Sequence, residues 1–471
     1  MNGDIDRPNI IWIMADDMGW GDLGAYGATK IPTPNTDRLA AEGCCFTDAH
    51  SSSAVCTPSR YSVLTGRYCW RTRLKSGVLW GHSPPLIDPD RLTVGQMLKD
   101  AGYATAAIGK WHLGLGWSRS EEDKGPNDDG ADVDYTKPIA DGPTTRGFDY
   151  YFGISASLDM PPYCFIENDD TVGVPNIEKH PYAAQQRKGR MTQGWIDENV
   201  DVTFTHKATQ FIKSHHGESP DQPFFLYMPM AAPHRPCVGP DFIRGISDAG
   251  PRGDMVALFD WAVGEVMSVL DHLGIADETL IIVTSDNGAR PADVDGDTHE
   301  HKSCGDWRGY KADIWDGGHR EPFIVRWPGT VQPGTRNDSL VCLGDFMATA
   351  ADIVGCDLPN DAAEDSLSFL PALMGNDDEM QREAIVHHSV GGMFSVRKGD
   401  WKLCERLGSG GFSEPRNPEP GPGDPPGQLY NLATDPAEAD NVWHDHPEIV
   451  ERLQALLQTY QDEGRSIPAR G

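Results

Sequence analysis

The chain has 471 residues, of which 38% are hydrophobic and 24% charged, a composition typical of a globular protein with one large domain and a smaller one. Its 40 Lys and Arg residues against 71 Asp and Glu residues give a net charge of −31, which argues against nucleic acids and anionic membranes as partners. No apolar run approaches the ~20 residues of a membrane span.

Two adjacent carboxylates follow the first predicted strand. Residues 7–14 form a short, continuous apolar run, as expected of a strand buried on both faces, and Asp16 and Asp17 come directly after it. Neighbouring carboxylates repel each other unless a cation lies between them, and open α/β sheets bind ligands at the carboxyl ends of their strands. We therefore predict a hard-cation site with oxygen ligands, against the alternative of a solvated turn.

A cysteine begins the next distinctive segment, Cys56-Thr-Pro-Ser-Arg60. Pro58 is typical of the first turn of a helix, so Cys56 is expected at the positive end of a short helix, where negative charge on its side chain is favoured. Arg60 would add a positive charge one turn away. The segment predicts a polarised nucleophile or an anion site, against the alternative of a small buried hydrophobic residue.

The pattern Cys-x-Pro-Ser-Arg, with Thr65-Gly-Arg67 behind it, resembles the signature of the type I sulfatases. The resemblance implies an alkaline phosphatase-like fold and a cysteine that a formylglycine-generating enzyme oxidises to formylglycine, an aldehyde whose hydrate is the nucleophile. The opening strand with its Asp pair and glycine-rich turn is similar to the start of these sulfatases, whose Asp pair binds calcium. One Ca²⁺ ion and formylglycine at position 56 are therefore the implied cofactors.

Lys110 and His112 follow the strand predicted at 103–108. In an extended chain, residues two apart point to the same side, although an isolated Lys-x-His is usually solvated surface. Gly-Lys-Trp-His-Leu-Gly closely resembles the second sulfatase signature. The resemblance places both side chains against the sulfate and the formylglycine hydroxyls.

Two later strands, predicted at 224–228 and 279–284, also lead into polar residues. His234 follows the first, and the resemblance places it against the sulfate and the leaving-group oxygen. Asp286 and Asn287 follow the second and offer oxygen ligands suited to calcium. They match the other half of the sulfatase metal site, which is complete only if this strand neighbours the first one.

The segment 307–329 resembles the sulfatase sequence Arg-Gly-x-Lys followed by acidic-Gly-Gly-x-Arg-x-Pro. The lysine of that sequence maps onto Lys311, and the resemblance implies that it contacts the sulfate and the bridging oxygen. His319 and Arg320 are equally consistent with a structural role, so the predicted site leaves them out.

The chain changes character beyond a linker at about 360–382. Short apolar segments separated by glycine predict an antiparallel sheet, and the Gly- and Pro-rich stretch 407–428 predicts a loop. We expect an α/β catalytic domain over 1–375, with a large, mostly parallel central sheet flanked by helices, and a smaller C-terminal subdomain of antiparallel sheet plus helix over 376–471. Helices are predicted at 34–43, 92–101, 201–213, 255–273, 343–355 and 447–463.

Sulfate ester hydrolysis explains why these residue types occur together. A cation polarises a sulfate oxygen and a bound hydroxyl, and cationic side chains stabilise the anion. By resemblance, the leaving alcohol takes a proton from His234 or Lys311, and His112 removes a proton when sulfate is expelled. The predicted metal ligands are Asp16, Asp17, Cys56, Asp286 and Asn287, and the predicted catalytic residues are Cys56, Arg60, Lys110, His112, His234 and Lys311.

Two alternative functions remain open. A phosphodiester or phosphonate monoester hydrolase of the same superfamily would share the nucleophile and the metal, although Ser59 favours the sulfatase branch. A calcium-binding module that binds sulfated glycans without formylglycine would leave the proton-transfer residues unexplained. Polar loops with aromatic residues suit a sulfated saccharide better than a steroid, and segments 116–166 and 407–428 are expected to frame the leaving-group pocket.

The cysteines and the N-terminus bear on the cellular compartment. The ten cysteines show no paired spacing, so neither a cysteine zinc site nor a dense disulfide framework is indicated, and mostly buried free thiols are expected. The first strand begins almost directly after Met1, which predicts no secretory signal. The expected location is cytoplasmic, or periplasmic or secreted if a leader has been removed.

Overall fold

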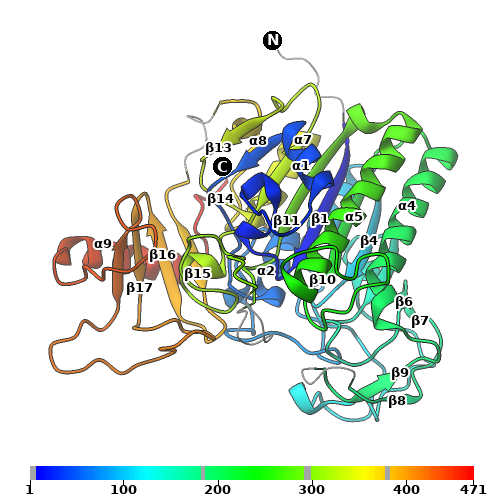
Figure 1. The fold of residues 1–471 in the computed structure, drawn as a ribbon, viewed down its shortest axis with the longest axis horizontal. Coiled ribbons are helices and arrows are strands. Elements are labelled where there is room, and N and C mark those ends of the chain that lie inside the picture. Colours follow the sequence, from blue (N-terminus) through cyan, green and yellow to red (C-terminus); the bar gives the residue numbers. More distant parts are fainter. Residues whose placement is uncertain (1–6, 182–185, 291–298, 377–381, 471) are drawn as a thin grey trace.

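The computed structural model describes residues 7–181, 186–290, 299–376 and 382–470. A ten-stranded sheet runs through the molecule in the order β13-β2-β12-β11-β1-β10-β4-β5-β6-β7 (Figure 1). Its centre is parallel, because β1 (Asn9–Asp16) pairs with β10 (Phe224–Pro233) on one side and with β11 (Thr279–Ser285) on the other. The predicted large, mostly parallel sheet is confirmed.

Alternating side chains of β1 divide the core into two layers, one on each face of the sheet. Trp12 packs in one layer, whereas Ile11 and Ile13 pack in the other, and all three are fully buried. Helices cover both faces (Figure 1). Those of the Trp12 layer are α2 (Cys56–Thr65), α3 (Val94–Asp100) and α7 (Phe346–Val354), and those of the other layer are α1 (Pro34–Ala41), α4 (Val200–Glu218) and α5 (Gly250–Leu273).

The predicted elements recur with ends that shift by a few residues. β10 continues to Pro233, five residues past its predicted end, and is buried along its whole length. α5 starts at Gly250 rather than at 255, because Pro251 fits the first turn of a helix. The remaining strands of this part are β2 (Cys44–Phe46), β3 (Ala49–His50), β4 (Ala104–Lys110), β5 (Tyr150–Ile154), β6 (Ile166–Glu167), β7 (Asp170–Thr171), β8 (Ile177–Lys179), β9 (Gly189–Met191), β12 (Phe323–Arg326), β13 (Thr335–Asn337) and β14 (Val341–Cys342), and α8 (Leu370–Leu373) is a single turn.

A second, four-stranded antiparallel sheet forms near the C-terminus, as predicted, and stands beside the large sheet (Figure 1). Leu453 of α9 (Pro447–Asp462) packs on it, in one cluster with Val396 and Leu403. The boundary between catalytic domain and C-terminal subdomain at 375–376 stays a prediction, and residues 377–381 of the predicted linker lie outside the described residues. The strands are β15 (Ile385–His388), β16 (Phe394–Lys398), β17 (Trp401–Cys404) and β18 (Gln428–Asn431).

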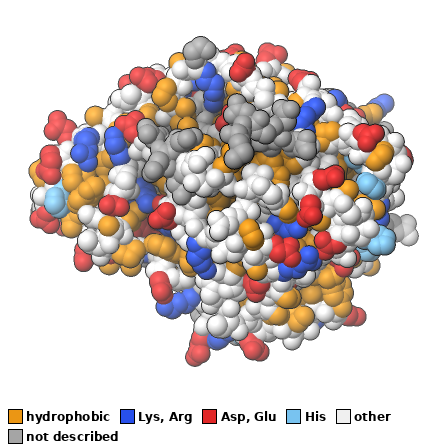
Figure 2. Space-filling view, turned by 90° about the horizontal axis from the view of Figure 1, so that it is seen from above, with side chains coloured by type: hydrophobic (Ala, Val, Ile, Leu, Met, Phe, Trp, Pro, Cys, Tyr) orange, Lys and Arg blue, Asp and Glu red, His pale blue; other side chains and the backbone are white. Residues whose placement is uncertain are grey.

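The surface and the thiols agree with the composition. Figure 2 shows Asp and Glu side chains spread over the face drawn, with Lys and Arg between them rather than in separate patches. All ten cysteines are free thiols, and eight of them are buried, as predicted. Over the described ranges, no helix has the length and apolar character needed to cross a membrane.

Candidate active site

The carboxyl ends of β1 and β11 bring two pairs of polar residues together. Because the two strands are parallel neighbours, Asp16 and Asp17 follow one strand where Asp286 and Asn287 follow the other. The backbone N–H of Asp17 donates to Oδ1 of Asp286 over 3.2 Å. The predicted metal site requires β1 and β11 to be neighbours, and this pairing is confirmed.

This set of oxygen atoms is suited to a cation. Asn287 Nδ2 donates to Oδ1 of Asp17 (2.8 Å), while the buried Oδ1 of Asn287 accepts no hydrogen bond from any described residue. A buried amide oxygen without a donor is costly unless another group meets it. Carboxylate and amide oxygens are the ligands that hard divalent ions prefer. One ligand atom from each of four residues also lies within 4.8 Å of the others, namely Asp16, Asp17, Cys56 and His234.

Each of the three carboxylates bonds to one cationic side chain, and all six groups are buried. A buried carboxylate needs such a partner, because burial of a lone charge costs several kcal/mol. The structure thus brings together the acidic residues and three of the cationic residues that the sequence singled out. The pairs are Lys110 Nζ–Asp16 Oδ2, Lys311 Nζ–Asp17 Oδ1 and Arg60 Nη2–Asp286 Oδ2, each 2.6 Å long.

These pairs set the charge states of the site. Burial opposes ionisation of Asp17, but Lys311 and His234 outweigh it and hold the pKa of Asp17 well below its ordinary value. Burial likewise opposes the charge of Lys311, but Asp17 outweighs it and raises the pKa of Lys311. For Asp286, burial outweighs Arg60, so the pKa of this carboxyl is raised. Asp17 and Lys311 therefore form a stable carboxylate–ammonium pair.

Cys56 is the first residue of α2 and is buried beside this pair. Its Sγ lies 3.4 Å from Oδ1 of Asp16 and 3.5 Å from Nζ of Lys311. Burial and Asp16 raise the pKa of the Cys56 thiol. The helix terminus was expected to polarise the thiol, and in the unmodified cysteine desolvation and a nearby carboxylate act against that effect.

The sequence predicted that Lys110 and His112 point to the same side of an extended strand, and the structure shows that they do not. Lys110 ends β4, but His112 has a φ of 57°, so the chain turns between them. His112 Nε2 is 2.8 Å from the carbonyl oxygen of Leu79, and its buried Nδ1 has no partner among the described residues. Burial and Lys110 lower the pKa of His112 well below its ordinary value, which favours the neutral imidazole.

His234 lies beside Asp17 and belongs to the cluster of Asp16, Asp17 and Cys56. Its Nδ1 is 2.8 Å from the carbonyl oxygen of Arg235, and its Nε2 is 3.6 Å from Oδ2 of Asp17. Because a carbonyl oxygen only accepts, Nδ1 carries the hydrogen and Nε2 is available to the site. Burial and Lys311 lower the pKa of His234 to about 3.

Asp159 is a neighbour of His234 that the sequence analysis missed. Its Oδ2 bonds Arg187 over 2.6 Å and lies 3.3 Å from Nε of Arg235, while Oδ1 is 4.0 Å from Nδ1 of His234. Asp159 is buried, and its Oδ1 has no hydrogen-bond partner among the described residues. It stands in an aromatic loop without any motif, so only the folded chain reveals its place.

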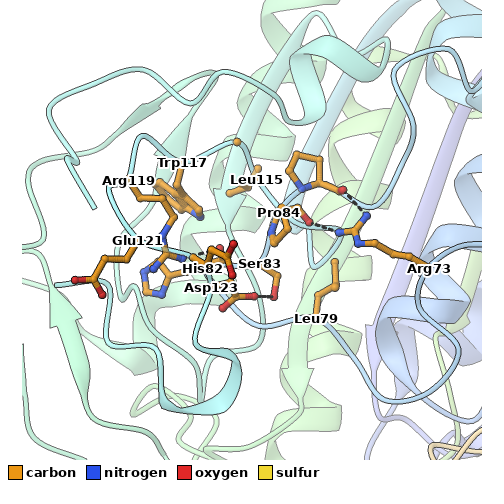
Figure 3. Close-up of a pocket in the computed structure, with 13 residues that line it drawn as sticks. Arg73, Leu79, His82, Ser83, Pro84, Leu115, Trp117, Arg119, Glu121 and Asp123 are labelled. Atoms are coloured by element: carbon orange, nitrogen blue, oxygen red, sulfur yellow. Dashed lines mark hydrogen bonds between the residues drawn. The ribbon is translucent and has the colours of Figure 1, made fainter. Parts of the chain in front are cut away.

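A pocket of about 580 Å³ opens next to this site (Figure 3). Leu79 connects the two, because its carbonyl meets His112 and its N–H donates to Oγ1 of Thr57 (3.1 Å). Part of the predicted loop 116–166 lines this pocket, and no residue of 407–428 is among its lining residues. The prediction that both segments frame the leaving-group pocket stays a prediction. The lining residues are Arg73, Leu79, His82, Ser83, Pro84, Pro85, Leu115, Gly116, Trp117, Arg119, Glu121, Glu122 and Asp123.

Comparisons with known proteins agree with this geometry. The sequence model of the family described as Sulfatase matches residues 8–356. The chain is 38% identical to an N-acetylgalactosamine-6-O-sulfatase of Bacteroides thetaiotaomicron over 96% of this chain and 93% of that protein, and 32% identical to bovine (Bos taurus) arylsulfatase A over 96% and 86%. A solved structure concerned with glycosaminoglycan metabolism by B. thetaiotaomicron covers 97% of this chain and 99% of its own, with 35% identity and a TM-score of 0.83.

Proposed function

The chain belongs to the sulfatase family and is a sulfuric ester hydrolase, and we propose that it releases sulfate from a sulfated saccharide through a formylglycine formed at Cys56, with one Ca²⁺ ion. One observation carries the proposal. The buried Cys56 side chain lies against Asp16, Asp17 and Lys311 and in one cluster with His234, and each of three buried carboxylates there pairs with a buried cation. This combination suits an anionic ester held beside a divalent cation and a nucleophile.

The proposed Ca²⁺ ligands are Asp16, Asp17, Asp286 and Asn287, together with the modified side chain at position 56. The donor set supports this choice, since these residues supply oxygen atoms and Oδ1 of Asn287 lacks any other partner in the described chain. The chemistry that calcium supplies when bound is polarisation of a sulfate oxygen and of a hydroxyl.

The state of the Cys56 thiol supports modification before catalysis. Burial and Asp16 raise its pKa, so the unmodified side chain is a poor nucleophile at neutral pH. When formed, formylglycine would supply a hydrated aldehyde at position 56. One hydroxyl would serve as the nucleophile toward sulfur, and loss of the proton of the other would let the C–O bond to sulfate break as the aldehyde re-forms. The partner that this step requires is a formylglycine-generating maturation enzyme.

The remaining side chains have roles in charge stabilisation and proton transfer. Arg60 and Lys110 would hold negative charge around the sulfate, while their present bonds fix Asp286 and Asp16. The unpartnered Nδ1 of His112 suits a proton acceptor for the second hydroxyl. The proton for the leaving oxygen comes from one of the two groups that flank Asp17: Lys311, which is an ammonium here, or His234, which would first have to take up a proton at Nε2.

A sulfated saccharide is the proposed substrate class. The relatives at 38% and 35% identity are an N-acetylgalactosamine-6-O-sulfatase and a protein concerned with glycosaminoglycan metabolism. The pocket beside Leu79 is lined by Trp117 and Pro84, which offer apolar surface to a sugar ring (Figure 3). We therefore expect the leaving sugar to extend toward this pocket.

The test is sulfate release from a panel of sulfated mono- and oligosaccharides by protein matured with a formylglycine-generating enzyme. N-acetylgalactosamine 6-sulfate, a steroid sulfate and a phosphodiester should be included, with Cys56→Ala protein as the control. We expect release from one sugar position and none from the steroid. Turnover of the phosphodiester with silence on every sulfate ester would overturn the proposal and select the phosphodiesterase alternative.

A further inference from the structure

Three buried histidine rings lie together where the four-stranded sheet meets the rest of the molecule, away from the Asp16–Asp17 site. His50 ends β3, His319 follows the 3₁₀ turn Asp316–Gly318, and His387 lies in β15. All three side chains are fully buried, and one ring nitrogen of each lies within 4.8 Å of the others. The rings of His319 and His387 stack with centroids 3.7 Å apart, and His50 is 5.2 Å from both.

One nitrogen of each ring faces an oxygen atom that can only accept a hydrogen bond. These oxygen contacts favour a hydrogen on the outward nitrogen of each neutral imidazole and a lone pair on the inward one. Cationic donors also approach two of the outward nitrogens: Arg397 Nη1 is 3.3 Å from Nε2 of His50, and Lys402 Nζ is 3.2 Å from Nε2 of His319. The outward contacts are His50 Nε2–Asp48 Oδ1 (2.9 Å), His319 Nε2–Ile314 O (3.1 Å) and His387 Nδ1–Ser51 O (2.9 Å).

The inward nitrogens lack donors of their own. Nδ1 of His50 and Nδ1 of His319 are 3.0 Å apart, and Nε2 of His387 is buried without a hydrogen-bond partner among the described residues. Two lone pairs at this distance repel each other unless a cation or a proton lies between them. The cluster therefore has the electronic character of a cation site built from nitrogen ligands.

We propose that His50, His319 and His387 bind a divalent transition metal ion such as Zn²⁺ through these three inward nitrogens. Zn–N bonds of about 2.0–2.1 Å put two ligand nitrogens of a tetrahedral ion roughly 3.3 Å apart, which is close to the observed separation of the two Nδ1 atoms. Metal-binding histidines also donate their other N–H to a carboxylate or a backbone carbonyl, as all three do here. Full burial is typical of a structural metal site.

The surrounding charges favour a transition metal over calcium. Three cations and three carboxylates flank the rings, so their charges cancel and no free carboxylate is left to attract a hard ion. Imidazole nitrogen is a ligand for zinc, copper and nickel, whereas calcium prefers oxygen. The flanking residues are Arg320, Arg397 and Lys402 with Asp48, Asp316 and Glu438.

A network of hydrogen bonds alone is the competing explanation. Lys402 Nζ lies 3.2 Å from Nε2 of His319, and a bond there would move the hydrogen of His319 to Nδ1, which would donate to His50. Lys402 also bonds Asp316 and Glu438 over 2.8 Å each, and its third N–H is the one that this alternative directs at His319. The metal proposal further requires the His387 ring to tilt from its stack on His319, since a metal lies in the plane of each imidazole that binds it.

The proposal is tested on the full-length protein with Zn²⁺ as the probe. Wild type, His387→Gln and His388→Gln are stripped with a chelator, incubated with Zn²⁺, desalted, and their zinc is counted by mass spectrometry. His388 is the matched control, because it is the next residue of β15, is equally buried, and stands outside the cluster. Zinc at the Asp16–Asp17 site is the same in all three proteins.

We expect wild type and His388→Gln to retain one more equivalent of zinc than His387→Gln. Crystals of the loaded protein should show an anomalous peak at the zinc edge between the three inward nitrogens. Equal zinc in all three proteins, or no peak there, would overturn the proposal in favour of the hydrogen-bonded network. If His387→Gln does not fold, the zinc content of His319→Gln and the anomalous peak of wild type distinguish the metal site from the hydrogen-bonded network in the same way.

Discussion

Two buried polar clusters each include one residue of the segment 308–320, Lys311 or His319, and they use opposite chemistry. Around Lys311, carboxylates pair with cations at 2.6 Å, so the site is rich in charge and in oxygen atoms. Around His319, neutral rings direct nitrogen lone pairs at one another, and the neighbouring charges cancel. One short segment thus serves an oxygen site suited to chemistry on an anion and a nitrogen site suited to holding parts of the fold together.

The segment between these clusters is held by tight backbone contacts. Gly317 N–H donates to the carbonyl of Arg308 (2.7 Å), and Gly288 N–H donates to that of Gly318 (3.0 Å). A Cβ on Gly288 would lie 1.9 Å from the carbonyl oxygen of Gly317, so only glycine fits there. Asn287 and Lys311 are therefore positioned by the same turn that leads to His319.

Replacement of the nucleophile should abolish the activity of the Lys311 cluster and leave metal binding by the His319 cluster unchanged. We expect Cys56→Ala to lower sulfate release by roughly 10⁴-fold or more, the scale on which loss of a catalytic nucleophile acts. The anomalous zinc peak between the inward nitrogens of His50, His319 and His387 should be the same in crystals of this variant and of wild type. Residual activity within tenfold of wild type would show that Cys56 is not the nucleophile.

Removal of a proton donor should depend on the substrate. His234→Ala and Lys311→Ala are each expected to lower kcat on a sugar sulfate by roughly 10²–10⁴-fold, because an alkoxide leaves poorly without a proton. With 4-nitrophenyl sulfate, whose leaving group needs no proton, the variant that lacks the donor should lose far less. Equal losses on both substrates in both variants would mean that neither residue protonates the leaving oxygen.

Loss of the buried ammonium of Lys402 tests how firmly the four-stranded sheet is attached. Lys402→Met leaves Asp316 and Glu438 buried without their shared cation, and we expect the free energy of unfolding to fall by about 3–5 kcal/mol. The matched control is Lys398→Met, since Lys398 pairs with Glu383 at the surface and should cost about 1 kcal/mol or less. Denaturant titration of both variants measures the difference, and equal costs would contradict a buried junction.

Acid should destabilise the sheet through the fully buried ring of His388 in β15. Burial lowers the pKa of His388 from 6.5 to about 4, so the unfolded chain takes up a proton at a higher pH than the folded protein does. The free energy of unfolding is therefore at its full value above pH 6.5 and decreases as the pH falls toward 4. We expect wild type to lose up to about 3 kcal/mol more than His388→Leu between pH 7 and pH 4. Parallel unfolding curves for the two proteins at every pH would exclude this contribution.

The sequence by itself predicted four central strands and the polar residues that follow them. Apolar runs predicted β1, β4, β10 and β11, and the motif after each strand supplied its polar residues. Parallel strands place their carboxyl ends at one edge, so this pattern predicted an oxygen site around Asp16 and Asp286, but only the structure made β1 and β11 neighbours. The motif also placed Lys311 there, and the structure brings its Nζ within 2.6 Å of Asp17.

Only the tertiary structure decided what depends on burial and on distant contacts. The pKa of Cys56 rises because of desolvation and a nearby carboxylate, which no local pattern reveals. Asp159 reaches His234 from an aromatic loop without a motif. His50, His319 and His387 stand in three separate segments, each of which reads alone as ordinary packing, and they meet only because the four-stranded sheet docks against the loop that follows β3.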